Sequence, residues 1–298
     1  MILFISEVKK LLRKYLPNKI YFGVYGLFKK AKGEQFLQWK QKKQLYFVKK
    51  RAYEFELQDI HFPIILDPDN GGVDSEIYAD GAYEPGILKI IRNTLKRDSI
   101  FVDVGANIGQ HSLFASLFAK HVYAFEPIEK IYKQFLESVT VNDFTNINIY
   151  NYALGNEEKT LPIFGNVGNM GASSLVTSEN RKKIQDIQVF RFDDVRENIG
   201  IHTIDFIKID VEGYELDVLF GAEKSIMMCK PIIMIEFSPY FYNQIDVTIS
   251  KKIIEWIIDM GYIIYDIGDG STQRNIISKD SDVGSIVQTN FLCINKKN

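Results

Sequence analysis

From about residue 86 onward, short apolar runs alternate with amphipathic helical stretches, and this alternation restricts the fold more than any other feature. The apolar runs, each bounded by turn residues, are Ile100–Val104, His121–Phe125, Ile147–Tyr150, Ile204–Ile209, Ile232–Phe237, Tyr262–Ile267 and Asn290–Ile294. Runs of this length between helices are typical of buried strands in a parallel sheet. The last two runs are joined by a polar segment without a good helical pattern, so we expect the final strand to return antiparallel. The sequence predicts an α/β fold with a doubly wound, mainly parallel sheet of seven strands, covered by helices on both faces.

The first 60 residues differ in composition from the rest of the chain. Up to Arg51 there are 14 Lys/Arg and two acidic residues, a balance of +12, whereas the remainder carries −14. Apolar residues between Phe4 and Leu16 recur at helical spacing opposite lysines, which predicts a basic amphipathic helix. Residues 1–17 could bind an anionic membrane surface, or the helix could pack on the main domain with its lysines in solvent. We therefore expect a basic, aromatic-rich helical extension over residues 1–60 and one main domain over residues 61–298.

The overall composition is that of an ordinary folded protein. Hydrophobic residues make up 46% and charged residues 25% of the chain, which excludes a disordered or collagen-like protein. No stretch approaches the roughly 20 apolar residues that span a bilayer, and the opening apolar run meets Glu7 too soon for a secretory signal. We expect a cytoplasmic protein, with peripheral membrane contact left open. The aromatic and basic residues of the extension come without an RNA-binding signature, so no nucleic-acid partner is expected.

The strongest single motif is the strand, glycine turn and helix pattern of Phe101–Ser112. Gly105 and Gly109 allow a tight turn and a close approach to a ligand, at the end of the strand where doubly wound sheets bind nucleotides. A dinucleotide fingerprint would place glycines at 105, 107 and 110, whereas this chain has Asn107 and Gln110. Glu126 ends the next strand, where a carboxylate can accept hydrogen bonds from ribose hydroxyls. The alternative is that Asp103 and Glu126 only cap turns.

These residues resemble the FkbM-type S-adenosylmethionine-dependent methyltransferases. The resemblance is carried, in order, by Tyr83–Pro85, VDVGANIGQHS at Val102–Ser112, AFEP at Ala124–Pro127, YALG at Tyr152–Gly155, Gly171–Ser174, IKIDVEG at Ile207–Gly213 and IEFSP at Ile235–Pro239. It covers about half the chain and does not reach residues 1–60. It implies a seven-stranded, Rossmann-like class I methyltransferase fold and O-methylation of a sugar or of a hydroxyl on a complex metabolite.

The resemblance also implies which residues bind the cofactor, S-adenosyl-L-methionine. They are Glu84, Asp103, Gly105, Asn107, Gly109, Glu126, Pro127, Asn151, Ala153, Leu154 and Asp210. Among them the glycine turn would bracket the methionine part, Glu126 would bind the ribose, and residues 151–154 would line the adenine. We expect a side chain at position 105 to clash with the cofactor.

Candidate catalytic residues cluster after the fourth and fifth predicted strands. If the fourth strand continues as far as Glu212, its period of two places Lys208, Asp210 and Glu212 on one side. Glu236 ends the neighbouring strand. Asp210, Glu212 and Glu236 could then converge, either to bind Mg²⁺ or to supply a base that takes the proton of an alcohol. The alternative is a structural salt-bridge set with Lys208. His111, in the first turn after the glycine loop, is a further candidate base.

The glycine-rich segment 165–174 is expected to be a flexible loop that closes over the acceptor. The sequence as a whole predicts an S-adenosylmethionine-dependent O-methyltransferase that acts on a small-molecule or glycan acceptor. The acceptor hydroxyl is expected on a sugar of a surface-glycan or secondary-metabolite precursor. Two alternatives stay open: an NAD-dependent oxidoreductase, and a catalytically silent, membrane-associated partner in glycan assembly.

Overall fold

The computed structural model describes residues 51–67, 70–166, 169–174, 182–242, 245–270, 275–284 and 286–296. The chain forms two compact units: one ends at Tyr83 and takes in Val167–Gly171, and the other holds Glu84–Asn166 and Ala172–Asn298. The division therefore lies at Tyr83, whereas composition placed it at residue 60. The predicted basic helix and the rest of residues 1–50 lie outside the described residues.

In the first unit, strands β1 (Arg51–Leu57) and β2 (Ile60–Leu66) form an antiparallel hairpin. Tyr53 and Phe55 are buried while Glu54 and Glu56 between them are exposed, which is the period of a half-buried strand. The prediction of a helical extension up to residue 60 is thus wrong for residues 51–60. Helix α4 (Gly72–Asp80) follows the hairpin.

The second unit is built on an eight-stranded sheet with the order β13-β12-β14-β11-β10-β3-β4-β5. The strands are β3 (Ile100–Val104), β4 (His121–Phe125), β5 (Ile147–Tyr150), β10 (Phe206–Ile209), β11 (Ile232–Phe237), β12 (Tyr262–Asp266), β13 (Asn275–Ile277) and β14 (Thr289–Asn295). All seven predicted strands are present, and short β13 is added at one edge. From β5 to β11 neighbouring strands are parallel, and β14 runs antiparallel between β11 and β12. The predicted doubly wound α/β fold with an antiparallel last strand is confirmed.

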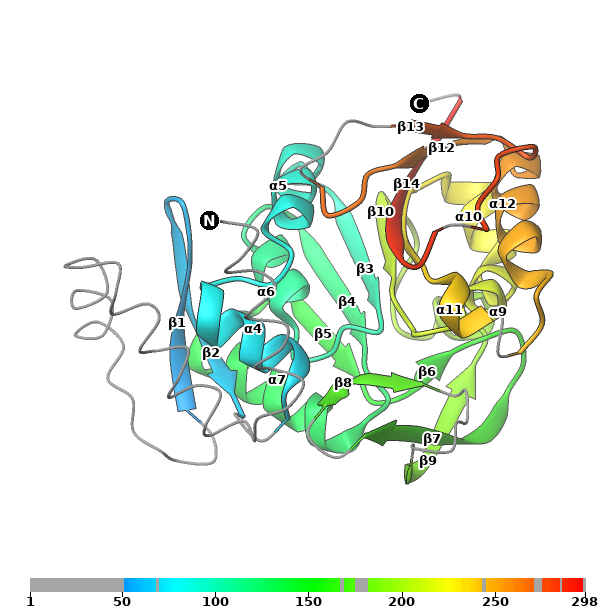
Figure 1. Cartoon of the computed structure of the whole chain (residues 1–298). Coiled ribbons are helices and arrows are strands. Elements are labelled where there is room, and N and C mark those ends of the chain that lie inside the picture. The colour runs from blue at the N-terminus through cyan, green and yellow to red at the C-terminus, as the bar shows by residue number, and fades with distance from the viewer. Residues whose placement is uncertain are drawn as a thin grey trace, which may run out of the picture. The chain divides into compact units, whose positions relative to one another are not determined.

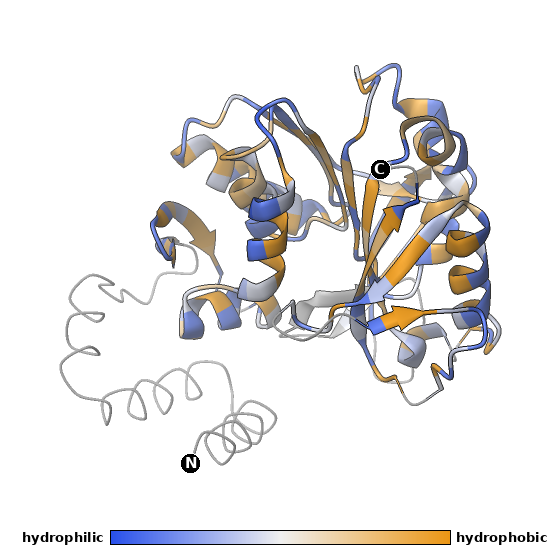
Figure 2. Ribbon diagram, turned by 90° about the horizontal axis from the view of Figure 1, so that it is seen from above, coloured by the Kyte–Doolittle hydropathy of each residue, from blue (hydrophilic) through white to orange (hydrophobic). Residues whose placement is uncertain are grey.

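Helices cover both faces of this sheet. They are α5 (Pro85–Thr94), α6 (Gln110–Ser116), α7 (Glu129–Val141), α8 (Phe192–Val195), α9 (Glu215–Gly221), α10 (Glu223–Cys229), α11 (Pro239–Tyr242) and α12 (Ile249–Asp259). Figure 1 shows α5, α6 and α7 on one side and α9, α10 and α12 on the other. Helix α7 buries Ile131, Phe135 and Val139, four residues apart, so it presents one apolar stripe to the sheet. Figure 2 shows the hydrophobic central strands between the two helical layers.

A second, four-stranded sheet has the order β6-β9-β7-β8. Its strands are β6 (Ala153–Leu154), β7 (Lys159–Asn166), β8 (Asn169–Ser174) and β9 (Lys182–Phe190). The prediction of a flexible loop over 165–174 is wrong for the described part of that segment, because Gly165 pairs with Lys182 and 169–174 is a strand. Backbone hydrogen bonds to neighbouring strands outweigh the low strand propensity of glycine here. Among the described residues, the helices are too short or too polar to span a bilayer.

Candidate active site

The loop between β3 and α6 is closely packed at both of its glycines. The N–H groups of Gly105 and Ala106 donate to the carbonyl oxygen of Phe125 at 3.0 Å. Gly105 has φ +83°, and a Cβ there would lie 1.8 Å from the carbonyl oxygen of Asp210. Gly109 also has φ +83°, and a Cβ there would lie 2.1 Å from the ring of Phe135. The predicted clash at position 105 is therefore with the backbone after β10, whatever the cofactor does.

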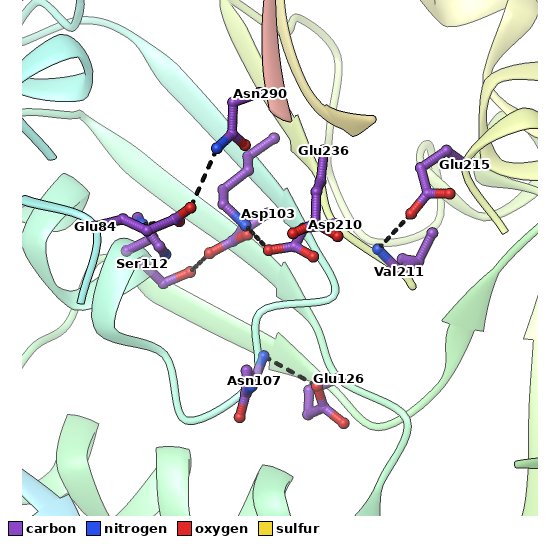
Figure 3. Close-up of polar contacts among 12 residues, drawn as sticks. Glu84, Asp103, Asn107, Ser112, Glu126, Asp210, Val211, Glu215, Glu236 and Asn290 are labelled. Carbon is purple, nitrogen blue, oxygen red and sulfur yellow. Dashed lines mark hydrogen bonds and ion pairs between the residues drawn. The ribbon is translucent and has the colours of Figure 1, made fainter. Parts of the chain in front are cut away.

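Glu126 lies beside this loop at the end of β4 and is 5% exposed. Its carboxylate accepts a hydrogen bond from the N–H of Asn107 at 3.0 Å (Figure 3) and another from the N–H of Ile128 at 2.8 Å. Asn107 itself has a positive φ of 53°, which turns its N–H toward the carboxylate. Burial raises the pKa of Glu126 to about 7, although both N–H donors lower it. Because a carboxylate has about four acceptor sites, Glu126 can still accept two hydroxyl donors.

The other residues expected near the cofactor's nucleoside part have identifiable structural contacts. Asn151 Nδ2 donates to the carbonyl oxygens of Glu126 at 2.9 Å and Pro127 at 3.0 Å, tying the ends of β4 and β5 together. Leu154 is 1% exposed in the hydrophobic core, and Ala153 pairs with β9. Their contact with an adenine stays a prediction.

Asp103 is fully buried on β3, directly opposite Lys208 of β10. Its Oδ2 accepts a hydrogen bond from Ser112 Oγ at 2.7 Å. Its Oδ1 has no hydrogen-bond partner among the described residues. Burial raises the pKa of Asp103, and the positive charge of Lys208 opposes this.

The three carboxyl groups predicted to converge do lie together. Oxygen atoms of Asp210, Glu212 and Glu236 lie within 4.8 Å of one another. The route differs from the prediction: β10 ends at Ile209, and Glu212 reaches the group through a turn with φ +54° rather than by strand alternation. Figure 3 shows Asp210 and Glu236 facing each other beside Asp103. The fourth residue of the predicted set, Lys208, places Nζ 2.8 Å from Asp210 Oδ2.

Of Asp210, Glu212 and Glu236, Glu236 has the most deeply buried carboxyl group, at 4% exposure. Its Oε1 accepts a hydrogen bond from Gln288 Nε2, and its Oε2 has no partner among the described residues. Burial, and then the nearby carboxylates of Asp210 and Glu212, raise the pKa of Glu236 well above its usual value. Such a carboxyl group is a stronger base than an ordinary one once it has lost its proton.

Lys208 carries a buried positive charge in this site, with a side chain only 4% exposed. Burial by itself lowers the pKa of a lysine, but the carboxylates of Asp210, Asp103 and Glu84 prevail and raise the pKa of Lys208. Lys208 therefore stays protonated at neutral pH.

Glu84 and His111 also lie near Lys208. Glu84 precedes α5 with a positive φ of 46°; its Oε1 accepts a hydrogen bond from Asn290 Nδ2 at 3.1 Å, and its Oε2 lies 3.6 Å from His111 Nε2. Burial, and then Lys208, hold the pKa of His111 well below its usual value of 6.5. A neutral His111 with so low a pKa is a weak base, which favours the carboxylates.

Sequence reasoning missed three residues that shape the site. Glu215 accepts hydrogen bonds from the N–H groups of Val211 and Gly213, each at 3.1 Å, and so fixes the turn that carries Glu212. Its position three residues after Glu212, at the start of a helix, was a usable signal. Gln288, just before β14, contacts Glu236, and Asn290 in β14 contacts Glu84; local sequence gave no signal for either.

The site thus combines a loop suited to a nucleotide-type cofactor with a group of carboxyl groups around a buried lysine. Both emerge at the carboxyl ends of adjacent parallel strands, which is where doubly wound sheets bind ligands.

Comparison with known proteins gives one family. A family model described as "Methyltransferase FkbM domain" matches residues 103–264, more than half of the chain. The chain is 28% identical over 181 residues to methyltransferase sdnD of Sordaria araneosa, covering 50% of this chain and 67% of that protein. It is 25% identical over 151 residues to hexuronic acid methyltransferase AglP of Haloferax volcanii, covering 51% of this chain and 61% of that protein.

Among solved structures, a methyltransferase FkbM from Methylobacillus flagellatus matches with a TM-score of 0.44 and 21% identity, covering 66% of this chain and 44% of the other. The chain thus spans about two thirds or less of the length of these relatives.

Proposed function

The chain belongs to the FkbM family of methyltransferases, and we propose that it transfers the methyl group of S-adenosylmethionine to a hydroxyl oxygen of a sugar in a surface-glycan or secondary-metabolite precursor. One observation carries the proposal: Asp210, Glu212 and Glu236 converge within 4.8 Å beside the glycine turn. The likeness to a hexuronic acid methyltransferase supports a sugar as the acceptor.

The residues present fit this cofactor. Glu126 has acceptor sites left for two ribose hydroxyls, and the backbone of 105–109 forms the turn beside it. Asp103 Oδ1 is buried without a hydrogen-bond partner among the described residues, which suits a positively charged ligand. S-adenosylmethionine supplies an activated methyl group on a positively charged sulfur.

The protein's tasks are to align the acceptor and to remove its proton. Alignment at near-attack distance can contribute about 7–11 kcal/mol to catalysis. In the proposed reaction the acceptor oxygen bonds to the methyl carbon, the carbon–sulfur bond breaks, and the hydroxyl proton passes to Glu236. Glu236 suits this role because Gln288 holds Oε1 while Oε2 has no partner among the described residues. Asp210 is less suited, since Lys208 shares its charge.

A divalent cation held by the same three carboxylates is the other way to activate the hydroxyl. Carboxylate oxygens are the ligands that Mg²⁺ prefers, and Asp210, Glu212 and Glu236 offer three. The metal version and the direct-base version require the same residues and differ in their response to chelation.

The test is transfer of labelled methyl from S-adenosylmethionine to a panel of uronic acids, neutral sugars and their glycosides. With an accepted sugar, Glu236→Gln should lower kcat by about 10²–10⁴-fold, the usual contribution of a positioned base, and Asp210→Asn should also lower kcat because it removes a charge beside Glu236. Glu223→Gln, on the exposed surface of α10, is the matched control and should leave kcat unchanged. Activity lost with EDTA and restored by Mg²⁺ would support the metal version. Full activity in both amide variants would contradict the assignment and return attention to His111.

A further inference from the structure

Carboxyl groups outnumber the basic side chains they contact at the ends of β3, β10 and β11. Asp103 and Asp210 both face the single ammonium group of Lys208. Glu236 adds a third carboxyl group, which lies next to Asp210. The nearby imidazole of His111 adds no positive charge, because its pKa is held well below neutrality. The site therefore holds more acidic than basic groups in a region shielded from water.

Two carboxyl oxygens of this set are left unsatisfied. Asp103 Oδ1 and Glu236 Oε2 are buried without a hydrogen-bond partner among the described residues, in side chains that are 0% and 4% exposed. A buried carboxylate without a partner is strongly unfavourable. A positively charged ligand next to these oxygens would relieve that cost.

The cofactor turn packs against the backbone of Asp210. A Cβ on Gly105 would lie 1.8 Å from the carbonyl oxygen of Asp210, so the turn that would hold the cofactor lies directly against the residue that begins the carboxylate cluster. A charge carried by a ligand in this turn would therefore lie near the cluster, in a buried region where water screens charges weakly.

We infer that the cluster of Asp103, Asp210 and Glu236 recognises the sulfonium charge of the methyl donor, so that the protein binds S-adenosylmethionine more tightly than its demethylated product, S-adenosylhomocysteine, which keeps the ammonium group but lacks the sulfonium charge. The inference rests on the proposed function and deepens it. Loss of the sulfonium charge on methyl transfer weakens product binding, and the product leaves readily. The positive charge of Lys208 offsets part of the negative charge of the cluster and so reduces the preference for S-adenosylmethionine over S-adenosylhomocysteine.

The test is isothermal titration calorimetry on the full chain in EDTA-containing buffer. The ligands are S-adenosylmethionine, S-adenosylhomocysteine, and an analogue with an amine-bearing carbon in place of the sulfonium. In the wild type, both charged ligands should bind at least about tenfold more tightly than S-adenosylhomocysteine, a difference of about 1.4 kcal/mol. Asp210→Asn and Glu236→Gln should bring the ratio toward one, whereas Lys208→Met should widen it. Glu223→Gln is the control and should keep the wild-type ratio.

Several outcomes would overturn the inference. Equal binding of the two cofactor forms, or tighter binding of S-adenosylhomocysteine, would contradict it while leaving the proposed function intact. Binding of neither form would overturn the proposed function as well. Titration of the protein with Mg²⁺ alone tests whether the cluster binds a metal instead of the methyl donor. Saturable Mg²⁺ binding that also abolishes the preference for S-adenosylmethionine over S-adenosylhomocysteine would assign the cluster to the metal. Circular dichroism of each variant shows whether it is folded, and the opposite shifts expected for Asp210→Asn and Lys208→Met cannot both follow from partial unfolding.

Discussion

Glu126 is the residue whose protonation should most directly affect cofactor binding. Its pKa is raised by burial to about 7, so its proton is bound increasingly as the pH falls below that value. Ribose hydroxyls donate to the charged carboxylate, and a protonated carboxyl group has fewer acceptor sites and no charge to strengthen them. Affinity for S-adenosylmethionine should therefore fall as the pH drops below about 7, by up to about tenfold per pH unit. Calorimetry across the pH range measures this.

Glu126→Gln is the control for that titration. It should bind S-adenosylmethionine weakly at every pH, with the step near neutrality removed. An affinity that stays constant through this range in the wild type would show that Glu126 does not bind the ribose.

Gly105 should be essential for a reason that the structure supplies. An added Cβ would lie 1.8 Å from the backbone oxygen of Asp210, whereas at Gly200, with a similar φ of +82°, it would meet nothing within 4 Å. Gly200→Ala should thus cost only the left-handed strain, about 1–2 kcal/mol. Gly105→Ala should cost more and also abolish cofactor binding, because the turn and the end of β10 must separate. Urea unfolding and calorimetry test this pair, and equal losses in both variants would contradict it.

At the scale of elements, β14 and the residue before it hold two carboxyl groups of the site in place. Its neighbourhood provides Gln288, which donates to Glu236 Oε1, and Asn290, which donates to Glu84 at 3.1 Å. Gln288→Ala removes the donor that orients Glu236, so kcat should fall by about tenfold or more, the cost of one lost charge-assisted hydrogen bond, while KM for S-adenosylmethionine stays near the wild-type value. Val287→Ala is the matched control at an adjacent residue that is 72% exposed. A loss of the same size in both variants would mean that the segment acts only through its fold.

The elements also show which parts of the fold and of the site could be predicted from the sequence, and why the other parts could not. The strands of the main sheet are continuous apolar runs, so their positions and the meeting of carboxylates at parallel strand ends could be predicted. Strand β1 was missed although Tyr53 and Phe55 alternate with exposed glutamates, because the basic, aromatic segment before it suggested helix. The contact between Glu84 and Asn290 joins residues 206 apart in sequence, and no local pattern encodes it.

At the scale of the whole molecule, charge is divided unevenly along the chain. The first 51 residues carry +12 and the remainder −14, and residues 1–50 lie outside the described residues. Deleting residues 1–17 should leave the affinity for S-adenosylmethionine unchanged, because the cofactor residues all follow Tyr83. If the basic segment binds membranes, sedimentation with anionic liposomes should fall with added salt, since each lysine near such a surface contributes about 1 kcal/mol that salt screens. Equal sedimentation with neutral and anionic liposomes would favour the packed helix instead.

The central claim is that one end of the sheet holds a methyl donor against a cluster of carboxyl groups. The most direct measurement is a crystal structure of the full chain with S-adenosylhomocysteine and an accepted sugar. We predict the ribose on Glu126, the sulfur facing Asp210 and Glu236, and a sugar hydroxyl within about 2.6–3.2 Å of a carboxylate oxygen, the reach of a general base. A cofactor bound in the turn between β3 and α6 with its sulfur directed away from Asp210 and Glu236, and no room for an acceptor beside them, would contradict the account.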